Sequence, residues 1–347
     1  MNDILKTDGE PALEYDTRVP VGGVTQPLVV GLPGLLPAAN GEMPALLAMA
    51  HRCGPVRTAI VHPCDASSLA ALVEASVGRG AGFIDPVIVA PRRKVEAAAA
   101  QAGIDLSGIP IEDVPHSHAA AQHAVELAAR GQVHALMKGS LHTDELMGAV
   151  VAPASGLQTG RRISHCFLLH APAYERPFII TDAAVNIAPD LAQKFEIARN
   201  AIGLAHALGV EEPRMAVLCA VETVNPQMHS TLDAAALAKM ADRGQLAGAV
   251  VDGPLAFDNA ISDVAARMKG ITSPVAGRAD ILLVPDIEAG NMLAKQLEFL
   301  GGAASAGIVL GARVPIVLTS RADSVPGRIA SCALAAILGA RERDGAG

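Results

Sequence analysis

Polar residues follow two short apolar runs near the end of the chain, Ile281–Val284 and Pro315–Thr319. A short apolar run bounded by Pro or Gly and followed by a helical pattern is typical of a parallel strand in an α/β sheet. Ligands of such sheets lie beyond the carboxyl ends of the strands. The polar side chains that we expect there are Glu288, Asn291, Lys295, Ser320, Arg321, Asp323 and Ser324. Hydroxyl, amide and cationic groups together suit a phosphorylated, anionic ligand.

The segment from Ser320 to Ser324 has the pattern of a helix N-terminus. Ser324 is a favourable N-cap residue, and Pro326 suits the first helical turn. Free amide groups and the helix dipole favour an anion at such an end, and the planar guanidinium of Arg321 suits phosphate. The alternative is capping alone, with Asp323 complementing the dipole and Arg321 in a surface ion pair. The spacing by itself favours this alternative.

Asn291 and Lys295 are four residues apart and therefore share one face of the expected helix. Gly290 permits a close backbone approach just before them. This arrangement could bind an anion at the end of the preceding strand. A capped helix with a solvated lysine is the alternative.

Lys138 and Ser140 follow a strand predicted at 133–137. They could form a second anion-binding loop, for phosphate or for the pyrophosphate of a nucleotide-like ligand. A turn that leads into a helix capped by Thr143 explains the same residues equally well.

The composition excludes several classes of protein. A net charge of -8 argues against a nucleic-acid binder, which normally has a basic face, but it allows a local cluster of cations. The five cysteines lack CxxC spacing, so we expect reduced core thiols. No apolar stretch approaches the ~20 residues that span a bilayer, and the acidic N-terminus does not resemble a signal peptide. We therefore expect a cytoplasmic protein without membrane contact and, since no ligand set has convincing spacing, without a metal.

The chain is organised as strands and helices in alternation from Met43 onward, after an arm at 1–42 rich in Gly and Pro. Such alternation predicts an α/β fold with doubly wound parallel sheets. Ten expected strands are many for one open sheet, which favours two domains. The Pro/Gly-rich stretch 150–160 is the expected crossover between them, and the turn-rich stretch 301–311 is the expected return.

Four segments, 220–244, 250–262, 269–291 and 315–324, resemble the phosphate acetyl/butyryltransferase family, and the likeness extends from Met43 to Leu338. The motifs IEAGN and TSRADS are more similar to the butyryl branch of the family than to the acetyl branch. The resemblance implies two α/β/α domains with a cleft between them, as in isocitrate and isopropylmalate dehydrogenases. Domain one would comprise 43–152 and 308–347, and domain two 153–307. The implied reaction is acyl-CoA plus phosphate giving acyl phosphate plus coenzyme A (CoA), with no bound cofactor and a homodimer or larger homo-oligomer.

The resemblance also implies catalytic roles. Ser320 and Arg321 fall on the family's serine–arginine pair, Ser320 to bind the carbonyl oxygen or thiol and Arg321 to hold the departing phosphate. The acetyl branch has its catalytic carboxylate seven residues after that serine, where this chain has Gly327, so Asp323 is the expected base for the CoA thiol. The acetyl branch also has an arginine where Met147 aligns. The expected replacements are Arg161 and Arg162.

Two other functions stay open. A metal- and NAD-dependent dehydrogenase of related fold is one alternative, although the chain lacks a GxGxxG motif. A regulatory protein that binds CoA without catalysis is the other, and Gly327 in the carboxylate position supports it. The length of the acyl group, acetyl or butyryl, also stays open.

Overall fold

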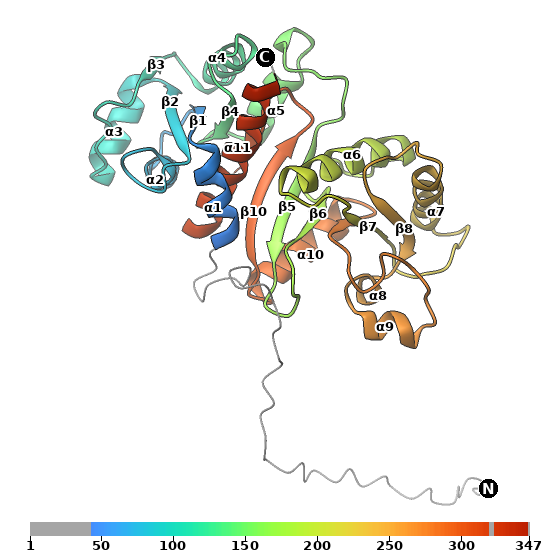
Figure 1. Cartoon of the computed structure of the whole chain (residues 1–347). Helices are drawn as coiled ribbons and strands as arrows, with labels where there is room; N and C mark the ends of the chain where they lie inside the picture. Colours follow the sequence, from blue (N-terminus) through green and yellow to red (C-terminus); the bar gives the residue numbers. More distant parts are fainter. Residues whose placement is uncertain (1–42, 319–322, 346–347) are drawn as a thin grey trace, which may run out of the picture. The chain divides into compact units, whose positions relative to one another are not determined.

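The computed structural model describes residues 43–318 and 323–345. The expected N-terminal arm, 1–42, lies outside the described residues. The described strands form one eleven-stranded mixed sheet in the order β3-β2-β1-β4-β11-β10-β5-β6-β9-β7-β8 (Figure 1). Their bounds are β1 Val56–Val61, β2 Ile84–Ala90, β3 Ile111–Asp113, β4 Ala135–Lys138, β5 Ser164–His170, β6 Phe178–Thr181, β7 Arg214–Leu218, β8 Val250–Leu255, β9 Ile281–Leu283, β10 Ala304–Leu310 and β11 Ile316–Val317.

Helices connect most of these strands, so the predicted α/β class is confirmed. Their bounds are α1 Pro44–Cys53, α2 Ala66–Ala75, α3 Arg92–Ala102, α4 Ser117–Ala129, α5 Thr143–Val151, α6 Leu191–Ala207, α7 His229–Asp242, α8 Phe257–Ile261, α9 Asp263–Met268, α10 Ile287–Phe299 and α11 Val325–Gly345, with a 3-10 turn at Pro153–Ser155. Several start at a side-chain cap, as in α2, where Asp65 accepts from the Ser68 amide at 2.7 Å.

Strand direction changes in the middle of the sheet. β3, β2, β1, β4 and β11 are parallel to one another, and so are β6, β9, β7 and β8. Between these groups, β10 is antiparallel to both β11 and β5, and β5 is antiparallel to β6. The two parallel groups therefore run in opposite directions. Seen along the strand direction, the carboxyl ends of one group lie at the top of the sheet and those of the other group lie at the bottom.

Three apolar clusters hold the layers together. One lies along a single face of the sheet, beneath α1, α2, α3, α6, α7 and α11. The other face has two separate clusters, one beneath α4 and α5 and one beneath α8, α9 and α10. The clusters consist mainly of Ala, Val, Leu and Ile, as the scarcity of aromatic residues (2%) predicted. Small side chains allow the helices to pack closely on the sheet.

The prediction that 301–311 is turn-rich is wrong, because Ala304–Leu310 is a full strand of the sheet, and the role of this stretch as a return between domains stays a prediction. Gly307 is necessary there, since a Cβ at this position would lie 2.9 Å from Nε2 of His165 on the neighbouring strand β5. The strands therefore form one mixed sheet, whereas the sequence predicted separate sheets that are parallel throughout. The predicted domain boundaries stay a prediction.

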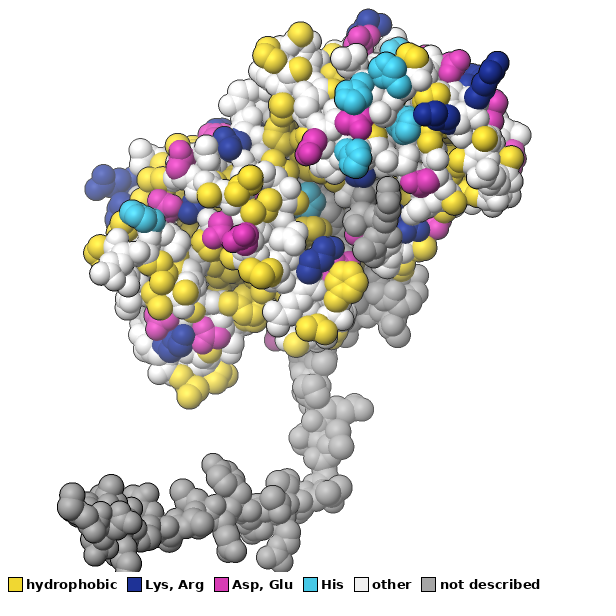
Figure 2. Space-filling view, turned by 180° about the vertical axis from the view of Figure 1, so that it is seen from behind, with side chains coloured by type: hydrophobic (Ala, Val, Ile, Leu, Met, Phe, Trp, Pro, Cys, Tyr) yellow, Lys and Arg dark blue, Asp and Glu magenta, His cyan; other side chains and the backbone are white. Residues whose placement is uncertain are grey.

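The surface shows no single basic field on the face seen in Figure 2, where Lys and Arg side chains are scattered among acidic and uncharged ones. Within the described part of the chain, no helix has the length and apolar character needed to cross a membrane.

Candidate active site

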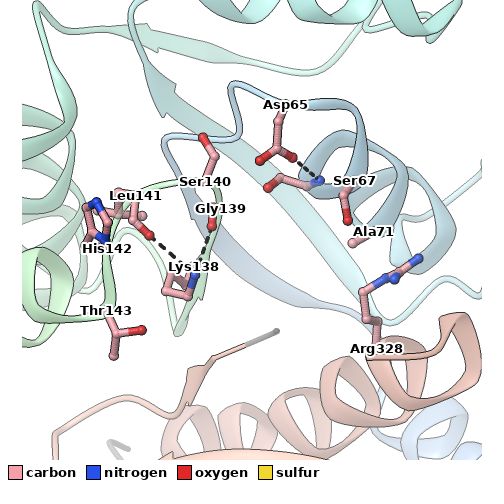
Figure 3. A pocket seen from close by; sticks show the side chains of 11 residues that line it. Asp65, Ser67, Ala71, Lys138, Gly139, Ser140, Leu141, His142, Thr143 and Arg328 are labelled. Atoms are coloured by element: carbon pink, nitrogen blue, oxygen red, sulfur yellow. Dashed lines mark hydrogen bonds between the residues drawn. The ribbon is translucent and has the colours of Figure 1, made fainter. Parts of the chain in front are cut away.

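A polar hollow of about 170 Å³ lies at the carboxyl ends of β1 and β4 (Figure 3). The end of β4, the following loop and the first residue of α5 contribute Lys138 to Thr143, and the start of α2 contributes Asp65, Ser67 and Ser68. Arg328, from the second turn of α11, completes the lining. The sequence predicted Lys138 and Ser140 at a strand end, and both line this hollow.

The hydroxyl of Ser140 joins the two loops. It donates to the carbonyl oxygen of His62 at 2.8 Å and accepts from the backbone amide of Cys64 at 3.1 Å. The backbones of these two segments approach so closely that a Cβ at Gly139 would lie 2.6 Å from the carbonyl oxygen of Val61. The hydroxyl of Ser140 thus has a structural role, and its predicted contact with substrate stays a prediction.

His62 follows β1 and has a φ of 55°, the only positive φ of a non-glycine residue among the described residues. Such a conformation costs of order 1–3 kcal/mol and is often found at functional sites. The Nδ1 atom of His62 lies 3.3 Å from Oγ of Ser140. Burial, followed by the charge of Lys94, lowers the pKa of His62, so this imidazole is neutral at pH 7. The sequence did not point to His62.

The cationic side chains of the hollow are Lys138 and Arg328, and Asp65 is its acidic one. Nζ of Lys138 donates to the carbonyl oxygens of Gly139 at 3.2 Å and of Leu141 at 3.4 Å (Figure 3). The guanidinium of Arg328 pairs with Glu74 at 3.1 Å, and its buried Nε has no hydrogen-bond partner among the described residues. The N-termini of α2 and α5 add amide groups and positive dipole ends. This arrangement can bind an anion such as phosphate.

The predicted catalytic pair, Ser320 and Arg321, lies outside the described residues. The chain on either side is close to the hollow. β11 pairs with β4 directly before Leu318, and the carbonyl oxygen of Asp323 accepts from Arg328 at 2.8 Å. Ser324 behaves as the predicted cap, since its Oγ accepts from the amide of Gly327 at 3.2 Å. Asp323 is partly buried.

The residues predicted on α10 do not line this hollow. Glu288 is exposed, and Asn291 donates to the carbonyl oxygen of Ala183 at 3.1 Å. Lys295 pairs with Glu298 at 3.3 Å and lies over the rings of Phe167 and Phe299, at 5.9 and 5.5 Å from their centroids. Their contact with substrate stays a prediction.

The two neighbouring arginines, Arg161 and Arg162, have different surroundings. Nε of Arg162 donates to Oδ1 of Asn186 at 2.5 Å, and Asn186 in turn donates to the buried carboxylate of Asp182. Arg161 is exposed and lines a different hollow, next to Gly311. Neither lines the hollow at β4. Among residues 43–318 and 323–345, no group of three or more His, Cys, Asp or Glu residues could hold a metal ion.

Fold and site together define a mixed α/β protein with a cationic hollow at the carboxyl ends of parallel strands. The model of a family described as "Phosphate acetyl/butaryl transferase" matches residues 116–336. The chain belongs to this phosphate acetyl/butyryltransferase family, as its sequence motifs predicted.

Individual relatives include both branches of the family. The phosphate acetyltransferase of Rhizobium meliloti is 57% identical over 307 residues, which cover 88% of this chain and 96% of that protein. The phosphate butyryltransferase of Clostridium acetobutylicum is 43% identical over 257 residues, covering 74% and 85% respectively. The solved structure of a branched-chain phosphotransacylase from Enterococcus faecalis V583 matches with a TM-score of 0.73 and 31% identity, covering 82% of this chain and 99% of that one.

Proposed function

We propose that this chain transfers a short acyl group between CoA and inorganic phosphate. The observation that carries the proposal is the 57% identity to a phosphate acetyltransferase along nearly the whole length of that relative. Acetyl is the favoured acyl group for the same reason, and butyryl is the second candidate because a butyryltransferase is 43% identical. The dehydrogenase alternative is not favoured, since the curated relatives are acyltransferases.

The proposed chemistry needs one proton transfer and two anion contacts. In the direction of thioester synthesis, a base takes the proton of the CoA thiol, and the thiolate attacks the carbonyl carbon of the acyl phosphate. The bond between that carbon and the phosphate oxygen then breaks, and phosphate leaves as an anion. We assign the base to Asp323, the carbonyl or thiol contact to Ser320 and the phosphate contact to Arg321.

The cationic hollow supports the phosphate part of this proposal. Lys138 and Arg328 lie where the chain that carries Ser320 and Arg321 leaves β11 and enters α11. A phosphate group in the hollow would meet these two cations and the amide groups at the start of α2. We further propose two α/β/α domains with the active site in the cleft between them, no bound cofactor, and a homo-oligomer in the cytoplasm.

The test measures release of the CoA thiol by the purified chain. Acetyl-CoA, butyryl-CoA and longer acyl-CoA substrates are each supplied with and without phosphate. We expect thiol release that requires phosphate and is fastest with acetyl-CoA, and a loss of about 100-fold or more in kcat for Ser320→Ala. Asp323→Asn tests the base.

Two outcomes would contradict the proposal. Thiol release no faster than the blank with every acyl-CoA would exclude the transferase, and tight CoA binding in the same preparation would then favour the regulatory protein. Reduction of NAD that requires magnesium or manganese would favour the dehydrogenase instead.

A further inference from the structure

A second polar hollow, of about 340 Å³, lies at the other edge of the sheet, next to the carboxyl end of β10 and the amino end of β11. One side consists of α6 and the last turns of α11, and the other consists of the loops at 159–161 and 311–315. The volume falls within the roughly 300–1,000 Å³ of small-molecule sites. The hollow shares no lining residue with the one at β4.

Three arginines line this hollow, Arg161, Arg313 and Arg341, and no aspartate or glutamate does so among the described residues. The whole chain has 35 acidic residues against 27 lysines and arginines, so a local excess of three positive charges is contrary to the general composition. Such a concentration of one charge in a concave surface attracts anions.

Two of these arginines are held in place by helix ends. Nη1 of Arg313 donates to the carbonyl oxygens of Ala129 and Gly156, each at 3.2 Å, and Nη2 of Arg341 donates to that of His206 at 3.1 Å. A guanidinium has five N–H groups, so each arginine keeps donors for a ligand. Arg161 is exposed, and within the described part of the chain its guanidinium has no hydrogen-bond or ion-pair partner.

The floor of the hollow contains a glycine that the fold does not require. Gly203 lies in the middle of α6, its φ is not positive, and a Cβ built there would meet no atom within 4 Å. A glycine inside a helix costs about 1 kcal/mol relative to alanine, so neither packing nor backbone conformation explains it. A ligand that approaches the helix backbone does explain it. Leu338, which is partly buried, lies beside Gly203 in the lining, and Leu204 and Ala207 are buried beneath it.

We propose that this hollow binds a nucleoside di- or triphosphate, with its phosphate groups on the three arginines and its base on the apolar floor. The site is separate from the substrate hollow, and the inference does not depend on the proposed reaction.

The experiment is a calorimetric titration of ADP into the full-length chain and into two variants. Arg341→Gln removes an arginine of the hollow that has no assigned role in the proposed reaction, and we expect at least about tenfold weaker binding. Gly203→Leu fills the floor, and we expect binding at this site to be lost. A Cβ at this position meets no atom within 4 Å and leucine favours the helix, so the variant should fold.

Two controls separate this site from others. Arg199→Gln removes an exposed arginine on the same helix that pairs with Glu196 and does not line the hollow, so ADP affinity should stay unchanged. Because CoA contains an ADP group, KM for acetyl-CoA is measured in each variant and should also stay unchanged.

The proposal would be overturned if no binding were seen at millimolar ADP, or if all four proteins bound ADP with equal affinity. It would also be overturned if KM for acetyl-CoA rose in parallel with the loss of ADP affinity. Adenosine that bound as tightly as ADP would exclude the role of the phosphate groups.

Discussion

Ser140→Ala tests how much one hydroxyl adds to the backbone hydrogen bonds that join the loops beside the candidate active site. Oγ of Ser140 donates to the carbonyl oxygen of His62 at 2.8 Å and accepts from the Cys64 amide at 3.1 Å. Both bonds connect the loop after β4 to the loop after β1. Alanine removes both, while the backbone amides of Ser140 and Cys64 still donate to the carbonyl oxygen of His62, each at 2.9 Å.

The expected loss follows from the value of these bonds. A typical hydrogen bond contributes about 1 kcal/mol, and an unsatisfied buried group adds a further cost. Because the backbone groups keep these other partners, we expect a decrease of about 1 kcal/mol in the free energy of unfolding for Ser140→Ala, with a rough range of 0.5–2 kcal/mol. We also expect KM for phosphate to rise, because Lys138 lies on the same loop as Ser140.

Urea unfolding followed by far-ultraviolet circular dichroism measures the stability, and the thiol-release assay measures KM. Ser67→Ala is the matched control, since Ser67 is an exposed serine of the same hollow whose hydroxyl makes no hydrogen bond among the described residues. It should change the free energy of unfolding by less than about 0.5 kcal/mol. An unchanged unfolding free energy in Ser140→Ala together with a raised KM would refute the structural role and indicate direct substrate contact.

Three further predictions concern the core. Gly290→Ala should lower the free energy of unfolding by about 1–3 kcal/mol, because the new Cβ would lie 2.7 Å from Cγ2 of Val284. Gly148→Ala is the control and should not lower it, since a Cβ at Gly148 meets no atom within 4 Å. Equal urea unfolding curves for the two variants would contradict this prediction. Burial lowers the pKa of His165 to about 4. As the pH falls below about 6.5, the unfolded chain therefore binds a proton at this imidazole, whereas the folded chain does so only near pH 4. The free energy of unfolding should decrease over this range by at most about 1.4 kcal/mol per pH unit. Urea unfolding at pH 7.5 and 5.0 should show a smaller pH effect in His165→Gln, and an identical effect would count against it. Burial raises the pKa of the Cys166 thiol to about 12, so iodoacetamide at pH 8 should label it only after denaturation, as mass spectrometry would show.

The sequence predicted the elements whose signals are local. β1 and β6 have the bounds that the sequence predicts, Val56–Val61 and Phe178–Thr181, because short runs rich in β-branched residues need no further context. The cap at Ser324 was predicted for the same reason, since a serine hydroxyl near free amide groups acts within a single turn.

Features that depend on distant contacts were not predictable. β10 contains small residues with low strand propensity and becomes a strand because β5 and β11 pair with its two sides. His62 precedes Pro63, which favours an extended backbone, yet its φ is 55°. Its amide donates to Val89 and its carbonyl oxygen accepts from Ser140, so contacts from two neighbouring segments determine its conformation.

The reversal of strand direction explains how α10 can contribute to the region around α11. β9 and β4 run in opposite directions, so α10 starts at the edge opposite the cationic hollow. At its far end, Glu298 pairs with Lys295 at 3.3 Å and accepts from Oγ of Ser305 at 2.9 Å. A Cβ at Gly327 would lie 3.2 Å from the carbonyl oxygen of Ser305. Glu298 and Lys295, near the end of α10, therefore approach Gly327 with only Ser305 between them. Gly327 stands where the acetyl branch has its catalytic carboxylate. The length of α10 makes this approach possible, although the carboxyl ends of β9 and β4 point in opposite directions.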